Sequence, residues 1–181
     1  MLHESYPWKR ELRRLRRVLA KLASEPLDEE IPDYRIEKPL LLSAIVVRRL
    51  IECWKVTDIT RAREFEVQSF PTLPQRGKTL TRLLMRSDID REFDLSAAAV
   101  TSMDAWEICS EIIHSGYINW EVDEGNRFVA IYLASMRNHG KRLLRIDLST
   151  YLLLLDAIAN DGVTGISSCL SETGKLEVKV Y

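Results

Sequence analysis

The prolines and glycines of this chain occupy opposite parts of the sequence, and that partition limits the folds it can adopt. All six prolines lie at or before Pro74, and all seven glycines lie at or after Gly77. Proline stops helices and stiffens connections, whereas glycine supplies the positive φ that hairpin turns require. We therefore expect helices joined by stiff links in the first half of the chain and strands with tight turns in the second.

Length and composition indicate one folded domain without a membrane span. A chain of 181 residues, with 46% hydrophobic and 29% charged residues, is ordinary for a single globular domain. The longest apolar stretch, Leu40–Val47, is far shorter than the ~18 residues of a membrane helix. The first residues lack the apolar core of a secretory signal, so we expect a cytoplasmic protein. Three cysteines without a CxxC pair exclude a dense disulfide scaffold, and we expect no metal and no cofactor.

Hydrophobic periodicity predicts four main helices. Leu40–Val47 is apolar on nearly every side, which predicts that this part of the second helix is buried all round at the centre of the core. The third helix is the most amphipathic, and Thr101 or Ser102 is its expected cap. The four helices are expected over residues 6–23, 39–56, 102–114 and 149–160.

Turn residues between apolar runs predict an antiparallel meander after the third helix. Two prolines and a glycine interrupt residues 57–95, where we expect a mobile excursion with a short helix near residues 79–86. The predicted fold is mainly α: a four-helix-type bundle with an inserted small antiparallel β-meander and a C-terminal strand. The strands are expected over residues 117–122, 127–134, 141–148 and 176–181.

The first predicted helix is strongly basic. Seven basic residues and a single acid lie between Lys9 and Lys21. Clustered lysine and arginine bind nucleic-acid phosphates by displacing counterions. A solvated helix face, or a face that meets an acidic protein partner, would have the same composition. The candidate nucleic-acid-binding residues are Arg10, Arg13, Arg14, Arg17 and Lys21.

Glu107, Glu111 and His114 share one narrow stripe of the third helix. The spacing of Glu111 and His114 is the one that di-iron helical bundles use, but no second pair of this kind exists in the sequence. A water-facing stripe that ends in a histidine favoured by the helix dipole explains the pattern without a metal. The chain also lacks a nucleophile elbow and a glycine-rich phosphate loop.

Three short motifs resemble bacterial HEPN-like proteins. They are Ile108-Cys-Ser-Glu-Ile-Ile-His114-Ser115 at the end of an amphipathic helix, Arg48-Arg49-Leu50-Ile51-Glu52 on an earlier helix, and Glu92-Phe-Asp-Leu95. The resemblance implies a small helical bundle that is usually dimeric and is often a metal-independent ribonuclease of toxin–antitoxin or antiviral systems. It assigns residues 38–161 to a HEPN-like core. Residues 1–27 are then a basic helix, and residues 162–181 a β segment, of the same domain.

The chain departs from the HEPN pattern at the catalytic positions. His114 matches the family histidine, but Glu107, Ile108 and Cys109 stand where an arginine is expected, and Glu111 replaces an asparagine. A carboxylate at that position repels a phosphate. Arg48 or Arg49 on the neighbouring helix is the candidate substitute for the missing arginine.

Three functions follow from these patterns. The leading hypothesis is a non-catalytic or weakly catalytic HEPN-like component of a bacterial stress or defence system, a homodimer that binds RNA or a protein partner. The second is a metal-independent endoribonuclease, with His114 as proton carrier beside Glu111 and with Arg48 or Arg49 as phosphate clamp. The third is an oligomerisation or scaffold module that donates its C-terminal strand to a neighbouring sheet edge.

Overall fold

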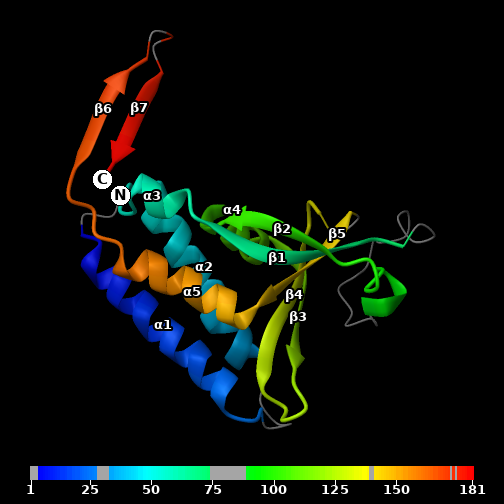
Figure 1. Cartoon of the computed structure of the whole chain (residues 1–181). Helices are drawn as coiled ribbons and strands as arrows, with labels where there is room; N and C mark the ends of the chain where they lie inside the picture. The colour runs from blue at the N-terminus through cyan, green and yellow to red at the C-terminus, as the bar shows by residue number, and fades with distance from the viewer. Residues whose placement is uncertain (1–3, 28–32, 74–88, 139–140, 172, 174) are drawn as a thin grey trace.

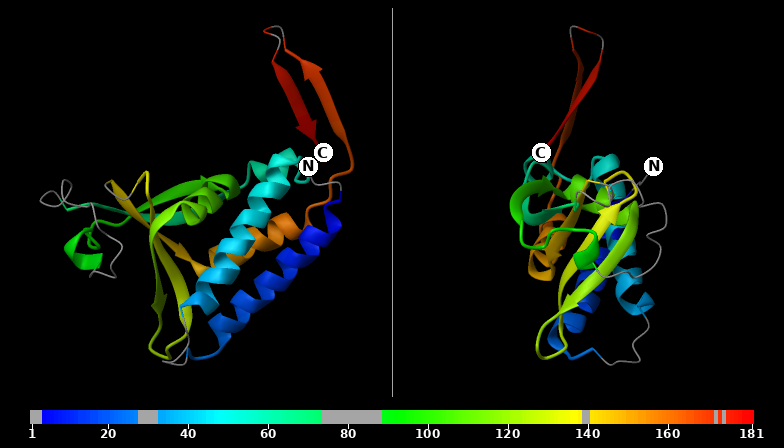
Figure 2. Two further views of the ribbon diagram at one scale, coloured as in Figure 1. Left: turned by 180° about the vertical axis from the view of Figure 1, so that it is seen from behind. Right: turned by 90° about the vertical axis from the view of Figure 1, so that its right-hand side faces the viewer.

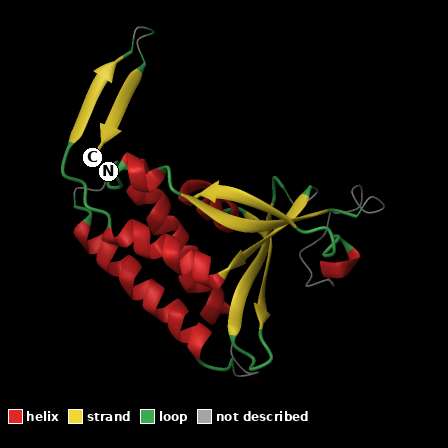
Figure 3. Ribbon diagram, viewed as in Figure 1, coloured by secondary structure: helices red, strands yellow, loops and turns green. Residues whose placement is uncertain are grey.

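The computed structural model describes residues 4–27, 33–73, 89–138, 141–171, 173 and 175–181. Of these residues 43% are helical and 31% lie in strands, so the expectation of a mainly α bundle is wrong. The chain forms a mixed α/β structure with a five-stranded antiparallel sheet, a layer of helices and a separate two-stranded hairpin (Figure 3). The structure contains three strands that the sequence periodicity did not predict, namely β1, β2 and β6.

Helices α1 (Tyr6–Ser24), α2 (Tyr34–Glu52) and α5 (Leu148–Asn160) pack against one another beside the sheet (Figure 1). The leucine stripe of α1 faces this layer, and Leu12 and Leu19 are fully buried. Helix α2 begins five residues before the expected start at Pro39, which lies inside the helix. Pro39 is the sixth residue of the helix, where proline removes one backbone hydrogen bond, and the helix nevertheless continues through it.

The large sheet has the strand order β2-β1-β5-β4-β3. The predicted meander is confirmed as strands β3, β4 and β5, and β5 also pairs with β1 on its other side. β1 lies within the segment expected to be an excursion, next to a short helix α3 (Asp58–Arg61), so that expectation is wrong for this part. The helix expected near residues 79–86 falls outside the described residues, and η1 (Ile89–Arg91) follows them. The strands are β1 (Glu64–Pro71), β2 (Ala99–Asp104), β3 (Ser115–Val122), β4 (Phe128–Ser135) and β5 (Arg142–Asp147).

The third helix is shorter than its periodicity predicted. Helix α4 spans Ala105–Ile113, and its cap is Asp104 rather than Thr101 or Ser102. Asp104 accepts a hydrogen bond from the Glu107 backbone N–H at 2.8 Å, and the Glu107 carboxylate accepts one from the Asp104 N–H at 3.1 Å. This reciprocal capping box fixes the helix start, and the preceding residues are free to extend the sheet as β2.

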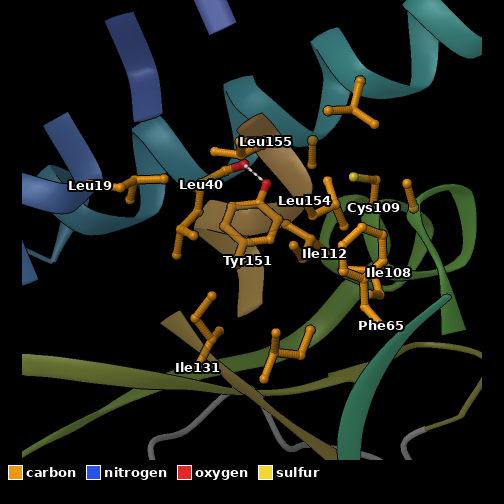
Figure 4. Close-up of a cluster of buried hydrophobic side chains, with 14 of the residues drawn as sticks. Leu19, Leu40, Phe65, Ile108, Cys109, Ile112, Ile131, Tyr151, Leu154 and Leu155 are labelled. Atoms are coloured by element: carbon orange, nitrogen blue, oxygen red, sulfur yellow. Dashed lines mark hydrogen bonds between the residues drawn. The ribbon is translucent and has the colours of Figure 1, made fainter. Parts of the chain in front are cut away.

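The main core lies between the helices and one face of the sheet. Tyr151 of α5 is fully buried there, and its hydroxyl donates to the Leu40 carbonyl of α2 at 3.4 Å (Figure 4). The same hydroxyl lies 2.8 Å from the Ser43 hydroxyl. The composition of Leu40–Val47 predicts a helix that is buried on every side, and this prediction is wrong. Leu40, Ala44 and Val47 face the core, whereas three of their apolar neighbours are 37–42% exposed, namely Leu41, Leu42 and Ile45.

The two C-terminal strands form a hairpin that projects away from the rest of the molecule (Figures 1 and 2). It consists of β6 (Ile166–Leu170) and β7 (Leu176–Val180), which pair with each other in antiparallel register. β7 confirms the predicted C-terminal strand. No helix among the described residues is long and apolar enough to cross a membrane.

Candidate functional site

The end of α4 is tied to the turn between β4 and β5. His114 is the C-terminal cap of the helix, and its backbone N–H donates to the Ser110 carbonyl at 3.0 Å. The His114 carbonyl accepts a hydrogen bond from the backbone N–H of Met136 at 2.9 Å. Because β3 starts at Ser115 and pairs there with Ser135 at the end of β4, the two ends must meet. The antiparallel register therefore places the β4–β5 turn beside His114.

The turn itself is held by Asn138. Its carbonyl accepts hydrogen bonds from the backbone N–H groups of Lys141 at 2.8 Å and Arg142 at 3.0 Å, and its own N–H donates to Ser135. The Asn138 side-chain amide donates a short hydrogen bond to the Glu111 carboxylate on α4. Asn138 therefore fixes the turn both internally and against the helix.

A cleft of about 630 Å³ lies between α4 and this turn. Its volume is within the ~300–1,000 Å³ typical of ligand pockets. Three cations from the turn and its flanks line it, together with two carboxylates, one imidazole and the side chain of Trp106. Its charged and titratable lining residues are Glu107, Glu111, His114, Arg137, Lys141 and Arg142.

Glu111 is the buried charge of this cleft, with only 9% of its surface exposed. Its Oε1 accepts from Asn138 and lies 3.8 Å from Nη2 of Arg142. Its Oε2 has no hydrogen-bond partner within the part of the chain that the structure describes. A buried carboxylate is costly unless it is paired, so Glu111 draws the Asn138 amide and the Arg142 guanidinium toward α4. Glu111 thus holds the cationic turn in position.

The structure brings His114 and Glu111 together in the cleft but not the two candidate arginines of α2. Arg48 donates to the Ser110 hydroxyl at 2.7 Å and stacks over the Trp106 ring, 3.5 Å from its centroid. Arg48 and Arg49 both pair with Glu52, at 3.2 Å and 2.8 Å. Neither is among the residues that line the cleft. Arg48 instead reaches the cleft indirectly, through two of its lining side chains.

Several basic side chains of helix α1 bind other residues of the same chain. Arg13 donates to the Ala159 carbonyl of α5 at 2.6 Å, and the neighbouring Arg16 pairs with Asp156 at 3.0 Å. Arg14 forms an ion pair with Glu11 at 2.6 Å, and Lys21 lies 3.8 Å from Glu25.

Arg17 donates to the Arg13 carbonyl, and Arg10 is exposed. Of the five candidate nucleic-acid-binding residues, three therefore already have a partner in a salt bridge or in a contact with α5. Because these three side chains already have partners within the chain, α1 is a weaker phosphate-binding surface than its sequence predicts.

Cys109, the cysteine of α4, does not supply a reactive thiolate to this site. Burial raises the pKa of the Cys109 thiol on α4, so the thiol stays protonated at neutral pH. Within the described residues, no group of three or more histidine, cysteine, aspartate or glutamate side chains is placed to hold a metal ion.

Sequence reasoning found His114 and Glu111 but missed the cations that face them. Residues 137–140 had been assigned only a turn role, although Arg137, Lys141 and Arg142 lie in or beside them. The available signal was the hairpin geometry of β3 and β4. If these strands pair without a long offset, the residues that follow β4 must lie next to those that precede β3.

No protein-family model, no curated protein and no solved structure matches this chain.

Proposed function

We propose that this protein binds single-stranded RNA through the phosphate-facing cations of the cleft, with little or no catalytic activity. The observation that carries the proposal is the convergence of Arg137, Lys141 and Arg142 on a concave surface beside His114. The five-stranded sheet departs from the helical bundle that the HEPN resemblance implied, so the proposal is based on the cleft. A role in a bacterial stress or defence system is a further part of the proposal that comes from the resemblance alone, and we also propose that the protein is cytoplasmic.

The charges of the cleft support a phosphate ligand. Three cations face two carboxylates there, and Glu111 is engaged by Asn138 and lies near Arg142. The exposed cations Arg137 and Lys141 lie in the turn, where a nucleic-acid backbone can reach them. Trp106 adds an aromatic lining residue, and Arg48 stacks over one face of its ring. Aromatic rings beside a cationic groove are the usual platform for unpaired bases. Single-stranded RNA satisfies both features with one ligand.

The test is fluorescence anisotropy with a labelled single-stranded RNA over a salt series. For three phosphate contacts, the logarithm of the binding constant should fall with the logarithm of salt with a slope of about −2. The double variant Arg137→Glu/Lys141→Glu should lose binding at least tenfold. The matched control is Arg10→Glu/Arg17→Glu on α1, which makes the same charge change outside the cleft and should bind within about twofold of the wild type. Absence of binding at low salt, or equal loss in both variants, would overturn the proposal.

The endoribonuclease remains a second candidate function because His114 is exposed and shares the cleft with Arg137 and Arg142. Histidine is the commonest proton-transfer group in enzymes, and a guanidinium stabilises charge on a phosphate under attack. Arg48 and Arg49 do not line the cleft, so an arginine of the β4–β5 turn would take the role first assigned to them.

The experiment for this candidate is RNA cleavage in the presence of EDTA. Wild-type protein should cleave, and His114→Ala should not, while both bind RNA equally. Equal cleavage by the two proteins, or none by either, would remove the candidate.

We also propose that the protein is a homodimer. The support for this comes from the apolar surfaces of the hairpin and of α2, which a single copy leaves exposed.

A further inference from the structure

The β6–β7 hairpin is amphipathic, and its apolar face is exposed everywhere except at the base, where Val180 is buried. Cross-strand partners share a face, and the register pairs Ile166 with Val180 and Leu170 with Leu176. These four residues and Val178 therefore lie on one side, and the opposite side is polar. Leu170 and Leu176 near the tip are 72% and 54% exposed. A lone two-stranded hairpin is at best marginally stable in water, so this one needs a cover on its apolar face.

The base of the hairpin is fixed so that it points outward. The Val180 backbone N–H donates to Oδ2 of Asp58 at 3.0 Å, which ties β7 to α3. The Gly165 and Tyr181 backbones exchange hydrogen bonds of 2.7 and 3.0 Å. Asp161, just before β6, accepts hydrogen bonds from Thr57 and Thr60. With both strands anchored, the hairpin projects from the end of the helix layer and cannot cover its apolar face with its own chain (Figure 2).

A second bare apolar surface lies on the outer side of α2. Tyr34, Leu41, Leu42 and Ile45 recur at helical spacing and are 37–58% exposed, and we call them the α2 strip. The strip spans eleven helical steps, or about 16 Å along the axis. A five-residue strand has four steps and spans about 13 Å. The hairpin strands are therefore slightly shorter than the strip, and each can lie along it.

We infer that two copies of this chain exchange hairpins, each laying its apolar face across the α2 strip of the other. The exchange covers both bare surfaces with one kind of contact, which a two-fold axis repeats. The contact consists of the exposed apolar face of the hairpin and of the strip with the adjacent Val18 and Lys38. It is therefore smaller than the ~20–30 residues per subunit of a standard interface, and the two-fold axis doubles it. The inference rests on the homodimer proposed above and is independent of RNA binding.

Light scattering coupled to gel filtration tests the exchange. Wild-type protein should elute as a dimer, whereas Leu170→Glu/Leu176→Glu on the hairpin and Leu41→Glu/Ile45→Glu on the strip should each elute as monomers. The dimer dissociation constant should rise roughly hundredfold or more, because buried aliphatic anchors dominate such contacts. The matched control, Glu177→Lys/Lys179→Glu, exchanges charges on the polar face of the hairpin and should remain dimeric. Circular dichroism should show that all variants are folded.

Mixing the two monomeric variants gives the decisive result. In a mixed dimer, the intact hairpin of the strip variant meets the intact strip of the hairpin variant. An equimolar mixture should therefore recover part of the dimer. A monomeric wild type, a strip variant that stays dimeric, or a mixture that stays monomeric would each overturn the inference. The anisotropy assay on the same proteins separates the two proposals. A monomeric wild type that binds RNA shows that the hairpin exchange has failed, and a dimeric wild type that does not bind RNA shows that the RNA proposal has failed.

Discussion

The sheet of the body and the hairpin at the C-terminus are both antiparallel, but only the sheet packs against a layer of helices. Strand β4 has a neighbour on each side, and Ile131 and Leu133 are fully buried under the helices. Every residue of β6 is exposed, and the strand has one neighbour within the described residues. The difference shows that alternation sets the faces of a strand, whereas burial by a second layer supplies the free energy that stabilises it. The following predictions test this comparison.

The largest expected effect is the difference in unfolding free energy between an alanine substitution in the core and one in the hairpin. Ile108→Ala removes a fully buried side chain from α4 and should lower the free energy of unfolding by about 2–5 kcal/mol. Leu170→Ala, at an exposed hairpin position, should change the unfolding free energy of the monomer by less than about 0.5 kcal/mol. Urea denaturation at protein concentrations that keep the chain monomeric measures both. Similar losses in the two variants would show that the hairpin is part of the same core.

Asp161 links the two regions, and its removal should have the next largest effect. Burial favours its neutral form, but hydrogen bonds from Thr60 and Thr57 and the charge of Lys9 outweigh burial and lower the pKa of this carboxyl. Asp161→Asn places an amide among those donors and should cost about 1–3 kcal/mol.

The same carboxyl also gives a signed pH dependence. Because the folded pKa of Asp161 lies below the unfolded one, its contribution is present at neutral pH and is lost as the pH falls below ~4. Wild-type stability should therefore fall more steeply in acid than that of the Asp161→Asn variant, as measured by thermal unfolding from pH 6 to pH 3. Parallel curves for the two proteins would contradict the prediction.

Tyr151→Phe tests a buried polar contact inside the body alone. The variant removes a hydroxyl that lies 2.8 Å from the Ser43 hydroxyl, which still donates to a backbone carbonyl within α2. The expected loss is about 1 kcal/mol, because a neutral hydrogen bond is exchanged without opening a large cavity. Chemical denaturation measures it, and dimer mass should be unchanged. A change in oligomeric state would show that α5 is coupled to the interface.

Gly165→Ala should have the smallest effect on stability and a local effect on the hairpin. A Cβ at this position would lie 2.5 Å from the Tyr181 ring, so the exposed ring must move. The melting temperature of the body should stay within about 1–2 °C of the wild type, as expected for a surface change. Limited proteolysis within residues 162–181 should become a few times faster. Gly162→Ala, where a Cβ meets no atom within 4 Å, is the matched control.

Much of the body could be predicted from periodicity, and its failures have physical causes. Helices α1 and α5 and the three meander strands follow from long, regular patterns within the sequence. β1 is as long as β3 and β4, but the register of β1 and β2 depends on partners far along the chain, such as Val67 opposite Thr101. Pairing of this kind leaves no local trace of its register, although Glu64-Phe65-Glu66-Val67 alternates as a half-buried strand does, and this signal was missed. The helical reading of residues 102–104 failed because β2 runs directly into α4.

The candidate site was predicted in part for the same reason. His114 and Glu111 lie on one helix, and helical spacing relates them directly. The cations of the β4–β5 turn reach them only through the pairing of β3 with β4. The contribution of Arg48 also depends on how α2 packs on α4, which spacing alone does not specify.

Strand β5 continues into α5 with no loop between them, since β5 ends at Asp147 and α5 begins at Leu148. Strand and helix therefore form one unbroken run of regular structure from residue 142, in the cleft, to residue 160. Residues 161–165, which belong to no helix or strand, connect this run to the hairpin. A displacement of the hairpin therefore reaches α5 only through this segment, whose first residue, Asp161, is held by Thr57 and Thr60.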